Sequence, residues 1–143
     1  MSETEQNIHQ KIWGNERWLV NTKDYCGKIL TVNKGYRSCI RYHRKKDETF
    51  YLLSGRILIE TGGKERIMQE EDVQRILPLT EHRFTGLEKS VIIEFSTHHE
   101  EEDSYRTTLS EKIPEEEFKE LLKRLGISNE SKNNLSKMWV RGY

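Results

Sequence analysis

Three residues in this sequence carry side chains that together can bind a metal ion: His43, Glu48 and His82. Two imidazoles and one carboxylate form a ligand set that suits a divalent ion such as Zn, Mn, Fe, Co or Ni and leaves positions open for a substrate. Such an ion can polarise a carbonyl or hydroxyl oxygen as a Lewis acid. If the fold brings the three side chains together, the sequence predicts a divalent metal centre here.

Arg41 argues against this site. It lies two residues before His43 on a predicted strand, so both side chains face the same side of the sheet. Arginine stays charged and cannot ligate a metal. Its repulsion of a divalent ion ~5 Å away amounts to several kcal/mol, even with an effective dielectric constant near 20. The alternative is a pocket without a cofactor, in which Arg41 pairs with Glu48 while His43 and His82 are hydrogen-bonded.

Short strands separated by turn residues are expected to position these side chains. The pair Gly62-Gly63 is a strong hairpin signal, and strands recur roughly every ten residues with no helical pattern between them. This pattern favours an antiparallel barrel or jelly roll over a fold that alternates strands and helices. The predicted strands span residues 28–33, 38–43, 49–53, 56–61, 64–68, 73–77, 82–85 and 90–97.

The C-terminal part of the chain predicts a short α-helix instead. Pro114 and the three glutamates that follow it are typical of a helix start, and Gly126 is typical of a helix end. An apolar stripe between them is expected to pack on the barrel. The stripe consists of Phe118, Leu121, Leu122 and Leu125.

The spacing of four residues resembles the first sequence motif of the cupins. That motif reads Gly, five residues, His-x-His, three or four residues, Glu, six residues, Gly, and the matching positions are Gly35, His43, Glu48 and Gly55. Arg41 replaces the first histidine of the motif.

The second cupin motif, GDxxxIPPGxxH, also has a counterpart. Residues 71–82 match it at Asp72, Ile76, Pro78 and His82, whereas Glu71 and Leu79 stand in place of its glycines. The resemblance covers about residues 28–97. It implies an all-β fold, the double-stranded β-helix or cupin jelly-roll barrel, with the short C-terminal α-helix added. The expected organisation is an N-terminal arm packing on the barrel (1–27), the barrel (28–109) and a C-terminal helix and tail (110–143).

A narrower resemblance is to the cupin domain of type II phosphomannose isomerases and to small sugar-isomerase-like cupins, including D-lyxose isomerases. It extends the likeness to about residues 13–106 and implies aldose–ketose isomerisation of a sugar or sugar phosphate. Glutamine and a triple histidine of that family are replaced by Arg41 and by His43-Arg44-Lys45. The segments that carry the likeness are Trp13-Gly14, residues 41–43, 48–50, 81–86, 93–96 and 102–106.

Further residues are candidates for roles in that reaction. His82 and Glu94 are the catalytic candidates; Glu94 is a candidate general base if its strand face is the lumen, and a solvated acid if it is not. Arg41, Arg106, Lys28 and Arg83 could bind the anionic oxygens of a substrate, although an exposed cation is the alternative for each. His98 and His99 point to opposite sides of a strand, so at most one of them could be a fourth ligand.

The overall composition restricts the partners. Lys plus Arg and Asp plus Glu both number 24, so no net field favours nucleic acid or an anionic membrane. No apolar run is long enough to span a bilayer, and no secretory signal or disulfide pattern is evident at Cys26 and Cys39. We expect a cytoplasmic protein with a small-molecule carbohydrate as substrate. Cupins of this size commonly form homodimers, and the N-terminal arm and the segment Trp139–Tyr143 are the expected contacts.

Two other functions remain open. One is a metal-free cupin that binds a carbohydrate or sugar nucleotide, either as a binding protein or as an isomerase or epimerase that uses histidine acid–base chemistry. The other is an iron oxygenase, which the same fold supports, because a fold does not determine a function.

Overall fold

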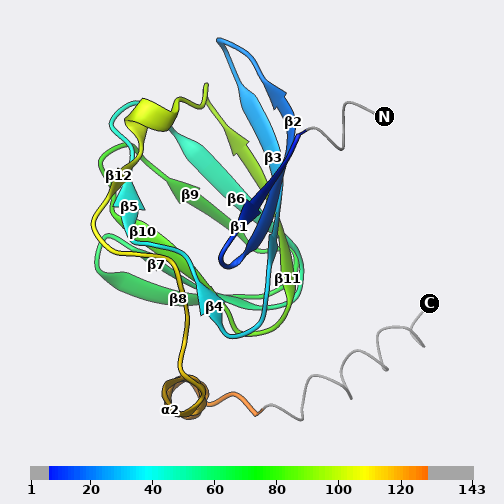
Figure 1. Ribbon diagram of the computed structural model, residues 1–143, viewed down its shortest axis with the longest axis vertical. Helices are drawn as coiled ribbons and strands as arrows, with labels where there is room; N and C mark the ends of the chain where they lie inside the picture. The colour runs from blue at the N-terminus through cyan, green and yellow to red at the C-terminus, as the bar shows by residue number, and fades with distance from the viewer. Residues whose placement is uncertain (1–6, 129–143) are drawn as a thin grey trace, which may run out of the picture. The chain divides into compact units, whose positions relative to one another are not determined.

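Two antiparallel β-sheets form the main body of the computed structural model, which describes residues 7–128 (Figure 1). The first sheet has the strand order β1-β2-β3-β11-β6-β9, and the second has the order β12-β5-β10-β4-β13, with the hairpin β7–β8 joined to it through β10. The first sheet consists of β1 (Ile8–Lys11), β2 (Gly14–Asn21), β3 (Cys26–Val32), β11 (Ser90–Ser96), β6 (Glu48–Ser54) and β9 (Val73–Ile76). The second consists of β12 (Tyr105–Arg106), β5 (Arg41–Tyr42), β10 (His82–Gly86), β4 (Tyr36–Arg37), β13 (Glu111–Lys112), β7 (Ile57–Thr61) and β8 (Lys64–Met68). The expected all-β architecture is therefore confirmed.

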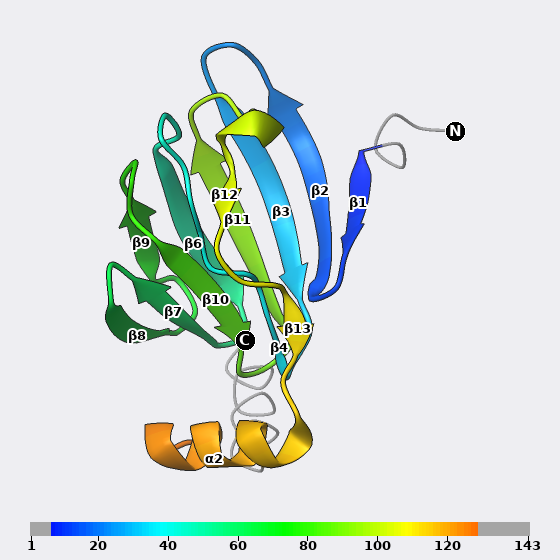
Figure 2. The same cartoon turned by 60° about the vertical axis from the view of Figure 1, so that its left-hand side comes forward.

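The inner faces of the two sheets enclose the hydrophobic core (Figure 2). Alternate residues of β3, β6 and β11 are buried, as a strand with one face inward requires. Along each of these strands the buried residues change from apolar to polar. Leu30, Leu52 and Ile92 are register neighbours at the apolar level, whereas Lys28, Glu48 and Glu94 lie at the other end of the same strands. One end of the lumen is thus an apolar core and the other is a polar pocket.

The N-terminal arm contributes two strands that the sequence pattern does not predict. β2 pairs with β3 along its whole length, and β1 pairs with β2. The strand signal is weak because the inward positions of β2 include Glu16, a buried carboxylate, in place of an apolar residue. Trp13, in the turn between the two strands, is 1% exposed and joins the core.

The predicted strand at residues 38–43 is the main difference from expectation. Only Arg41 and Tyr42 form a strand there, after the separate short strand β4. The backbone amides of Cys39 and Ile40 donate to the hydroxyls of Ser110 and Thr108 instead of to a strand carbonyl. These side-chain hydrogen bonds replace the ladder and interrupt the strand.

Within the described residues, 113–128 belong to a second compact unit, which contains the helix α2 (Glu115–Leu125). Pro114 is its N-cap, three glutamates occupy its first turn, and Gly126 ends it in the left-handed conformation with φ 73°. The predicted helix is confirmed, and the packing of its stripe on the barrel stays a prediction. None of the helices in residues 7–128 has the length and apolar character that crossing a bilayer requires. The segment Trp139–Tyr143 lies outside the described residues.

Two residues adopt a backbone conformation that normally requires glycine. Glu71 has φ 76° and Leu79 has φ 71°, and the described part of the chain contains no other non-glycine residue with positive φ. These are the two positions at which the second cupin motif has glycine. Their amides donate to the carbonyls of Leu52 and His43, at 2.8 and 2.6 Å, so the motif's turn is kept although its glycines are not. The left-handed conformation costs each side chain roughly 1 kcal/mol.

We predict that Leu79→Gly and Glu71→Gly each raise the free energy of unfolding by about 0.5–1 kcal/mol, because glycine relieves the strain at a smaller entropic cost. Urea denaturation measures this. Gly63→Ala is the matched control: Gly63 has φ 81° and open space around its missing Cβ, so alanine should lower the free energy of unfolding by a similar amount. A loss of stability in both glycine variants would contradict the prediction.

Candidate metal centre

The side chains of His43, Glu48 and His82 meet in the polar end of the lumen. Each is less than 6% exposed, and one ligand atom from each lies within 4.8 Å of the others. The Nε2 atoms of His43 and His82 are 3.1 and 3.3 Å from the same oxygen, Glu48 Oε2. Two atoms that bind one ion at about 2.1 Å and at right angles are about 3 Å apart, so the separation of each histidine nitrogen from Glu48 suits neighbouring ligands of one ion.

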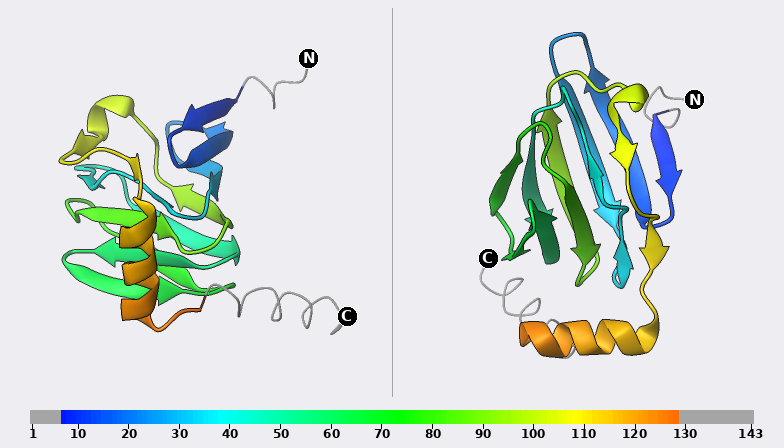
Figure 3. Two further views of the ribbon diagram at one scale, coloured as in Figure 1. Left: turned by 60° about the horizontal axis from the view of Figure 1, so that its bottom comes forward. Right: turned by 90° about the vertical axis from the view of Figure 1, so that its left-hand side faces the viewer.

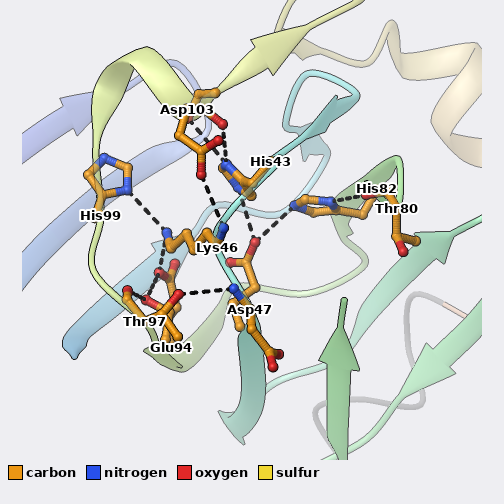
Figure 4. Close-up of polar contacts among 12 residues, drawn as sticks. His43, Lys46, Asp47, Thr80, His82, Glu94, Thr97, His99 and Asp103 are labelled. Carbon is orange, nitrogen blue, oxygen red and sulfur yellow. Dashed lines mark hydrogen bonds and ion pairs between the residues drawn. The ribbon is translucent and has the colours of Figure 1, made fainter. Parts of the chain in front are cut away.

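The backbone determines which nitrogen of each imidazole carries a proton. Nδ1 of His43 donates to the carbonyl of Asp103 at 3.0 Å, and Nδ1 of His82 donates to the carbonyl of Thr80 at 2.9 Å (Figure 4). A carbonyl only accepts, so in the neutral rings both Nε2 atoms carry lone pairs. Metal-binding histidines usually have this arrangement, with the second nitrogen donating to a carbonyl or carboxylate.

Both of these nitrogen atoms lie beside one buried carboxylate oxygen of Glu48. Oε2 has no hydrogen-bond partner among the described residues, and facing lone pairs repel. The arrangement becomes favourable if a cation lies between the three atoms or if the imidazoles gain a second proton. Burial raises the pKa of Glu48, but hydrogen bonds donated by the two imidazoles when each Nε2 carries a proton, together with the Lys46 ammonium, outweigh that effect and hold the pKa of Glu48 well below its ordinary value. Glu48 is therefore a carboxylate at neutral pH, as a metal ligand must be.

Two other buried carboxylates of the lumen are neutralised by lysines. Glu94 Oε2 lies 2.7 Å from Lys46 Nζ, and Glu16 Oε1 lies 3.4 Å from Lys28 Nζ. The Lys28 ammonium also lies 4.4 Å from the centre of the Trp18 ring. Glu94 thus faces the lumen, which settles the alternative left open by its strand position. Each buried charge has an opposite charge in contact, as a low-dielectric interior requires.

Lys46 connects the Glu94 carboxylate to His99. Its Nζ donates to Nδ1 of His99 at 3.1 Å (Figure 4). Nε2 of His99 therefore carries the proton and donates to Glu101 at 3.0 Å. Burial and the nearby charges of Lys28 and Lys46 lower the pKa of His99, so its ring is neutral at pH 7. Burial lowers the pKa of Lys46, but Glu94 and Glu48 outweigh burial and raise it above its ordinary value.

Asp103 holds the loop that carries His43 and Lys46. Its buried carboxylate accepts from the backbone amides of Arg44, Lys45 and Lys46 at 2.9–3.2 Å, while its own carbonyl accepts from His43. Asp103 ends the 3₁₀ helix η1 (Glu101–Asp103), far along the chain from the loop. A segment near residue 100 therefore fixes both the conformation of the 44–46 turn and the tautomer of a candidate ligand.

Arg41 does not form the ion pair with Glu48 that the metal-free alternative expects. Arg41 in β5 is paired in register with His82 of β10 on one side and with Arg106 of β12 on the other. It is partly buried and lines the same cavity as the three ligands. Within residues 7–128 its guanidinium has neither a hydrogen bond nor an ion pair.

The other predicted substrate-binding residues are divided between two places. Lys28 and Arg106 line the lumen with Arg41, whereas Arg83 does not: its guanidinium pairs with Glu60 at 2.6 Å and lines a separate cavity of about 530 Å³ beside the Gly62-Gly63 turn. Arg83 alternates with His82 along β10, and adjacent strand residues point to opposite faces. Sequence position alone therefore places it outside the lumen.

Four charged residues that line the lumen are absent from the set that the sequence predicts: Glu16, Lys46, Lys11 and Glu101. Lys46 lies in a polar turn that resembles a solvated loop, and Glu16 lies in the arm, where no strand is predicted. The alternation of β2, with buried residues at 14 and 16, is seen only in the structure, because no apolar pattern in the sequence marks this strand. No signal in the sequence marks Lys46, because its burial depends on the contact with Asp103.

The lumen narrows to a small cavity at the ligands. Its volume is about 20 Å³, which holds one or two water molecules or an ion. Exposure increases towards the mouth, where the side chains of Lys11, Arg106 and Glu101 are 29%, 45% and 58% exposed. The more exposed end of this cavity thus carries two cations and one carboxylate.

Solved structures with the same fold were found by comparison. KdgF from Halomonas sp. matches with a TM-score of 0.58 and 19% identity, over 71% of this chain and 87% of that one. A variant of Streptomyces PAC13 with uridine matches with a TM-score of 0.65 and 14% identity, over 77% of this chain and 88% of that one. An RmlC-like cupin from Shewanella frigidimarina matches with a TM-score of 0.63 and 16% identity, over 71% of this chain and 93% of that one. No protein-family model and no curated protein matches the sequence.

The fold is the cupin jelly roll. At these identities the likeness shows the fold alone, so the fold expected from the two motifs is confirmed (Figure 3). The narrower resemblance to phosphomannose and D-lyxose isomerases stays a prediction.

We predict that stability depends on pH through Glu16. Burial raises the pKa of Glu16, but Lys28, the Trp18 indole N–H, Lys11 and Arg41 outweigh it and lower the pKa from 4.5 to about 2. A depressed pKa stabilises the fold above the unfolded value of 4.5, and this contribution is lost as the pH falls towards 2. Glu16→Gln should cost about 3 kcal/mol at pH 7, and the difference from wild type should vanish near pH 2.

Urea denaturation at several pH values measures this difference, with the exposed Glu120→Gln as the control. A constant difference between wild type and Glu16→Gln from pH 7 to pH 2 would show that the ionised carboxylate contributes no stability.

We also predict that Asp103→Ala lowers the free energy of unfolding by about 2–3 kcal/mol, because the variant leaves the backbone amides of the 44–46 turn, of which that of Lys46 is buried, without their acceptor. The exposed neighbour Glu102→Ala is the matched control and should change the stability by less than about 0.5 kcal/mol. Chemical denaturation of both variants is the measurement. Equal stability of the two variants would refute the structural role given to Asp103.

Proposed function

We propose that this protein is a metal-dependent cupin that acts on a sugar or sugar phosphate, most plausibly as an aldose–ketose isomerase. His43, Glu48 and His82 would hold a divalent ion. The observation that carries this proposal is the pair of backbone carbonyls at Nδ1, which leaves two imidazole lone pairs directed at one buried carboxylate oxygen. When bound there, an ion supplies Lewis-acid polarisation of a carbonyl oxygen.

The substrate would be held by the cations around the mouth of the lumen. Arg41 and Arg106 are neighbours in register and can form charge-assisted hydrogen bonds to phosphate oxygens. Lys28 lies deeper and is already paired with Glu16. It would therefore act on the substrate only through the electric field of this ion pair, which lies beside the Trp18 ring. This order places an anionic group of the substrate at the mouth and its carbonyl carbon near the three ligands.

Glu94 is the candidate general base. Isomerisation needs a group that takes a proton from the carbon next to the carbonyl and returns it to the neighbouring carbon. The Glu94 carboxylate lines the lumen, is 4% exposed, and lies against the Lys46 ammonium. Its burial excludes the water that would exchange with the transferred proton.

His82 has a catalytic role only in the second candidate function, a metal-free cupin that binds a carbohydrate or sugar nucleotide. In the metal-dependent form both of its nitrogens are used, one by the ion and one by the carbonyl of Thr80. The observation that favours the second candidate is the hydrogen-bond distance from each Nε2 to Glu48, which would suit protonated imidazoles. Acid–base chemistry by His82 would then replace that of an ion.

The ligand of one structure with the same fold supports a hydroxylated substrate. PAC13 is a nucleoside dehydratase whose structure holds uridine, and it shares the fold of this chain. Homodimer formation and a cytoplasmic location stay predictions.

Metal analysis after purification without chelator tests the proposal. Wild type is expected to hold up to one equivalent of a divalent ion or to take up one equivalent of Co²⁺, because three ligands converge, whereas His82→Ala should lose this site. His98→Ala is the matched control, since His98 bonds to the Thr22 carbonyl outside the lumen. Metal content that is substoichiometric and unchanged in His82→Ala would leave the metal-free function as the better candidate.

Turnover is then measured on a panel of pentoses, hexoses and their phosphates with the metal-loaded protein. Glu94→Gln should lower kcat by about 10²–10⁴-fold while the metal content stays at the wild-type level.

A further inference from the structure

Three side chains form a row across the second sheet at the polar end of the lumen. Arg41 in β5 is the register partner of His82 on one side and of Arg106 on the other. Directly opposed residues on neighbouring strands have their side chains on the same face, with Cβ atoms about 5 Å apart. All three line the same cavity, so a candidate metal ligand and two guanidiniums stand side by side.

The charges of this row are only partly balanced. Glu16 and Glu94 are paired with lysines, and Arg106 is paired with Glu101 at 3.6 Å. Arg41 is partly buried and has no hydrogen bond or ion pair with any residue between 7 and 128. Like charges directly opposed across a sheet destabilise it, and a guanidinium removed from water normally has a polar partner.

A divalent ion at His43, Glu48 and His82 would increase this imbalance. The ion carries two charges and Glu48 contributes one negative charge, so the ligand site becomes positive beside the unpaired Arg41. Repulsion between Arg41 and the ion therefore weakens metal binding until an anion is present. A tetrahedral dianion also fits the guanidinium fork, which binds two oxygens at once.

We propose, on the basis of the metal-dependent function above, that a divalent ion in this lumen and a tetrahedral dianion at its mouth bind cooperatively, with the dianion held by Arg41 and Arg106. The substrate class is then a phosphate ester and not a neutral sugar. Linkage requires reciprocity: the dianion tightens metal binding by the same factor by which the ion tightens dianion binding.

Arg41 has two opposite effects under this proposal. Without an anion its charge repels the ion, so Arg41→Gln should bind metal more tightly than wild type. With a dianion present Arg41 is the group that holds it, so Arg41→Gln should gain little from the anion. A residue with a merely structural role would not produce this reversal.

Calorimetric titration of Co²⁺ into the metal-free protein measures both effects, in chloride and in sulfate at equal ionic strength. Sulfate is the probe for the tetrahedral dianion. Wild type should bind Co²⁺ about tenfold more tightly in sulfate than in chloride, a coupling within the usual range. Arg41→Gln should bind Co²⁺ about tenfold more tightly than wild type in chloride and show less than about a twofold gain in sulfate.

Two further variants complete the test. Arg66→Gln is the matched control, because Arg66 bonds to the Val73 carbonyl on the surface, and it should behave as wild type. Arg41→Lys keeps the charge but not the fork, and it serves if Arg41→Gln fails to fold. In chloride this variant should bind Co²⁺ with the wild-type affinity, and sulfate should raise that affinity less than it does in wild type.

The outcomes separate the two proposals. Co²⁺ affinity that is the same in chloride and sulfate, and unchanged by Arg41→Gln, would overturn the cooperative site and leave the metal site standing. Sulfate that raises the thermal stability without changing Co²⁺ affinity would also overturn it, because the two sites would be independent. Absence of Co²⁺ binding in both buffers would overturn the metal-dependent function and this inference together.

Discussion

The burial of three carboxylates at one end of a small barrel is the constraint on which the rest of this structure depends. Glu16, Glu48 and Glu94 come from three strands of one sheet and are each less than 7% exposed. A buried carboxylate is stable only beside a positive charge or several donors. Lysines supply that charge for two of them, whereas the third faces two imidazole lone pairs. Within the part of the chain that the structure describes, Glu48 thus differs from Glu16 and Glu94 in having no lysine within ion-pair distance.

The interactions that neutralise these carboxylates extend well beyond the lumen, because other residues must hold the neutralising lysines in place. Lys46 reaches Glu94 from a turn whose amides are bound by Asp103, and His99 accepts from the same lysine. The segment that follows β11 thus acts as a strap over the ligand loop. These hydrogen bonds hold the 44–46 turn against the segment that follows β11.

The elements of the fold follow closely from local pattern, and the exceptions have identifiable causes. The alternation in Cys26–Val32, Glu48–Ser54 and Ser90–Ser96 is strong enough to locate those strands from the sequence. The strand at 38–43 is interrupted because hydroxyls from Thr108 and Ser110 take its amides, which no local pattern reveals. β2 is missed for a different reason: it turns a carboxylate inward, and the usual apolar signal is absent.

The sequence by itself determined the identity of the three candidate ligands, because their types and their spacing in two motifs resemble those of cupins. Only the tertiary structure decided what surrounds them. Lys46, Glu16 and Asp103 are ordinary charged residues in the sequence, and distant segments bring them to the lumen. Arg41 is an example of both. Its charge can be read from the sequence, whereas its lack of an ion pair with Glu48 and its alignment with His82 and Arg106 arise from strand register. That register depends on pairing between segments about 40 and 65 residues apart.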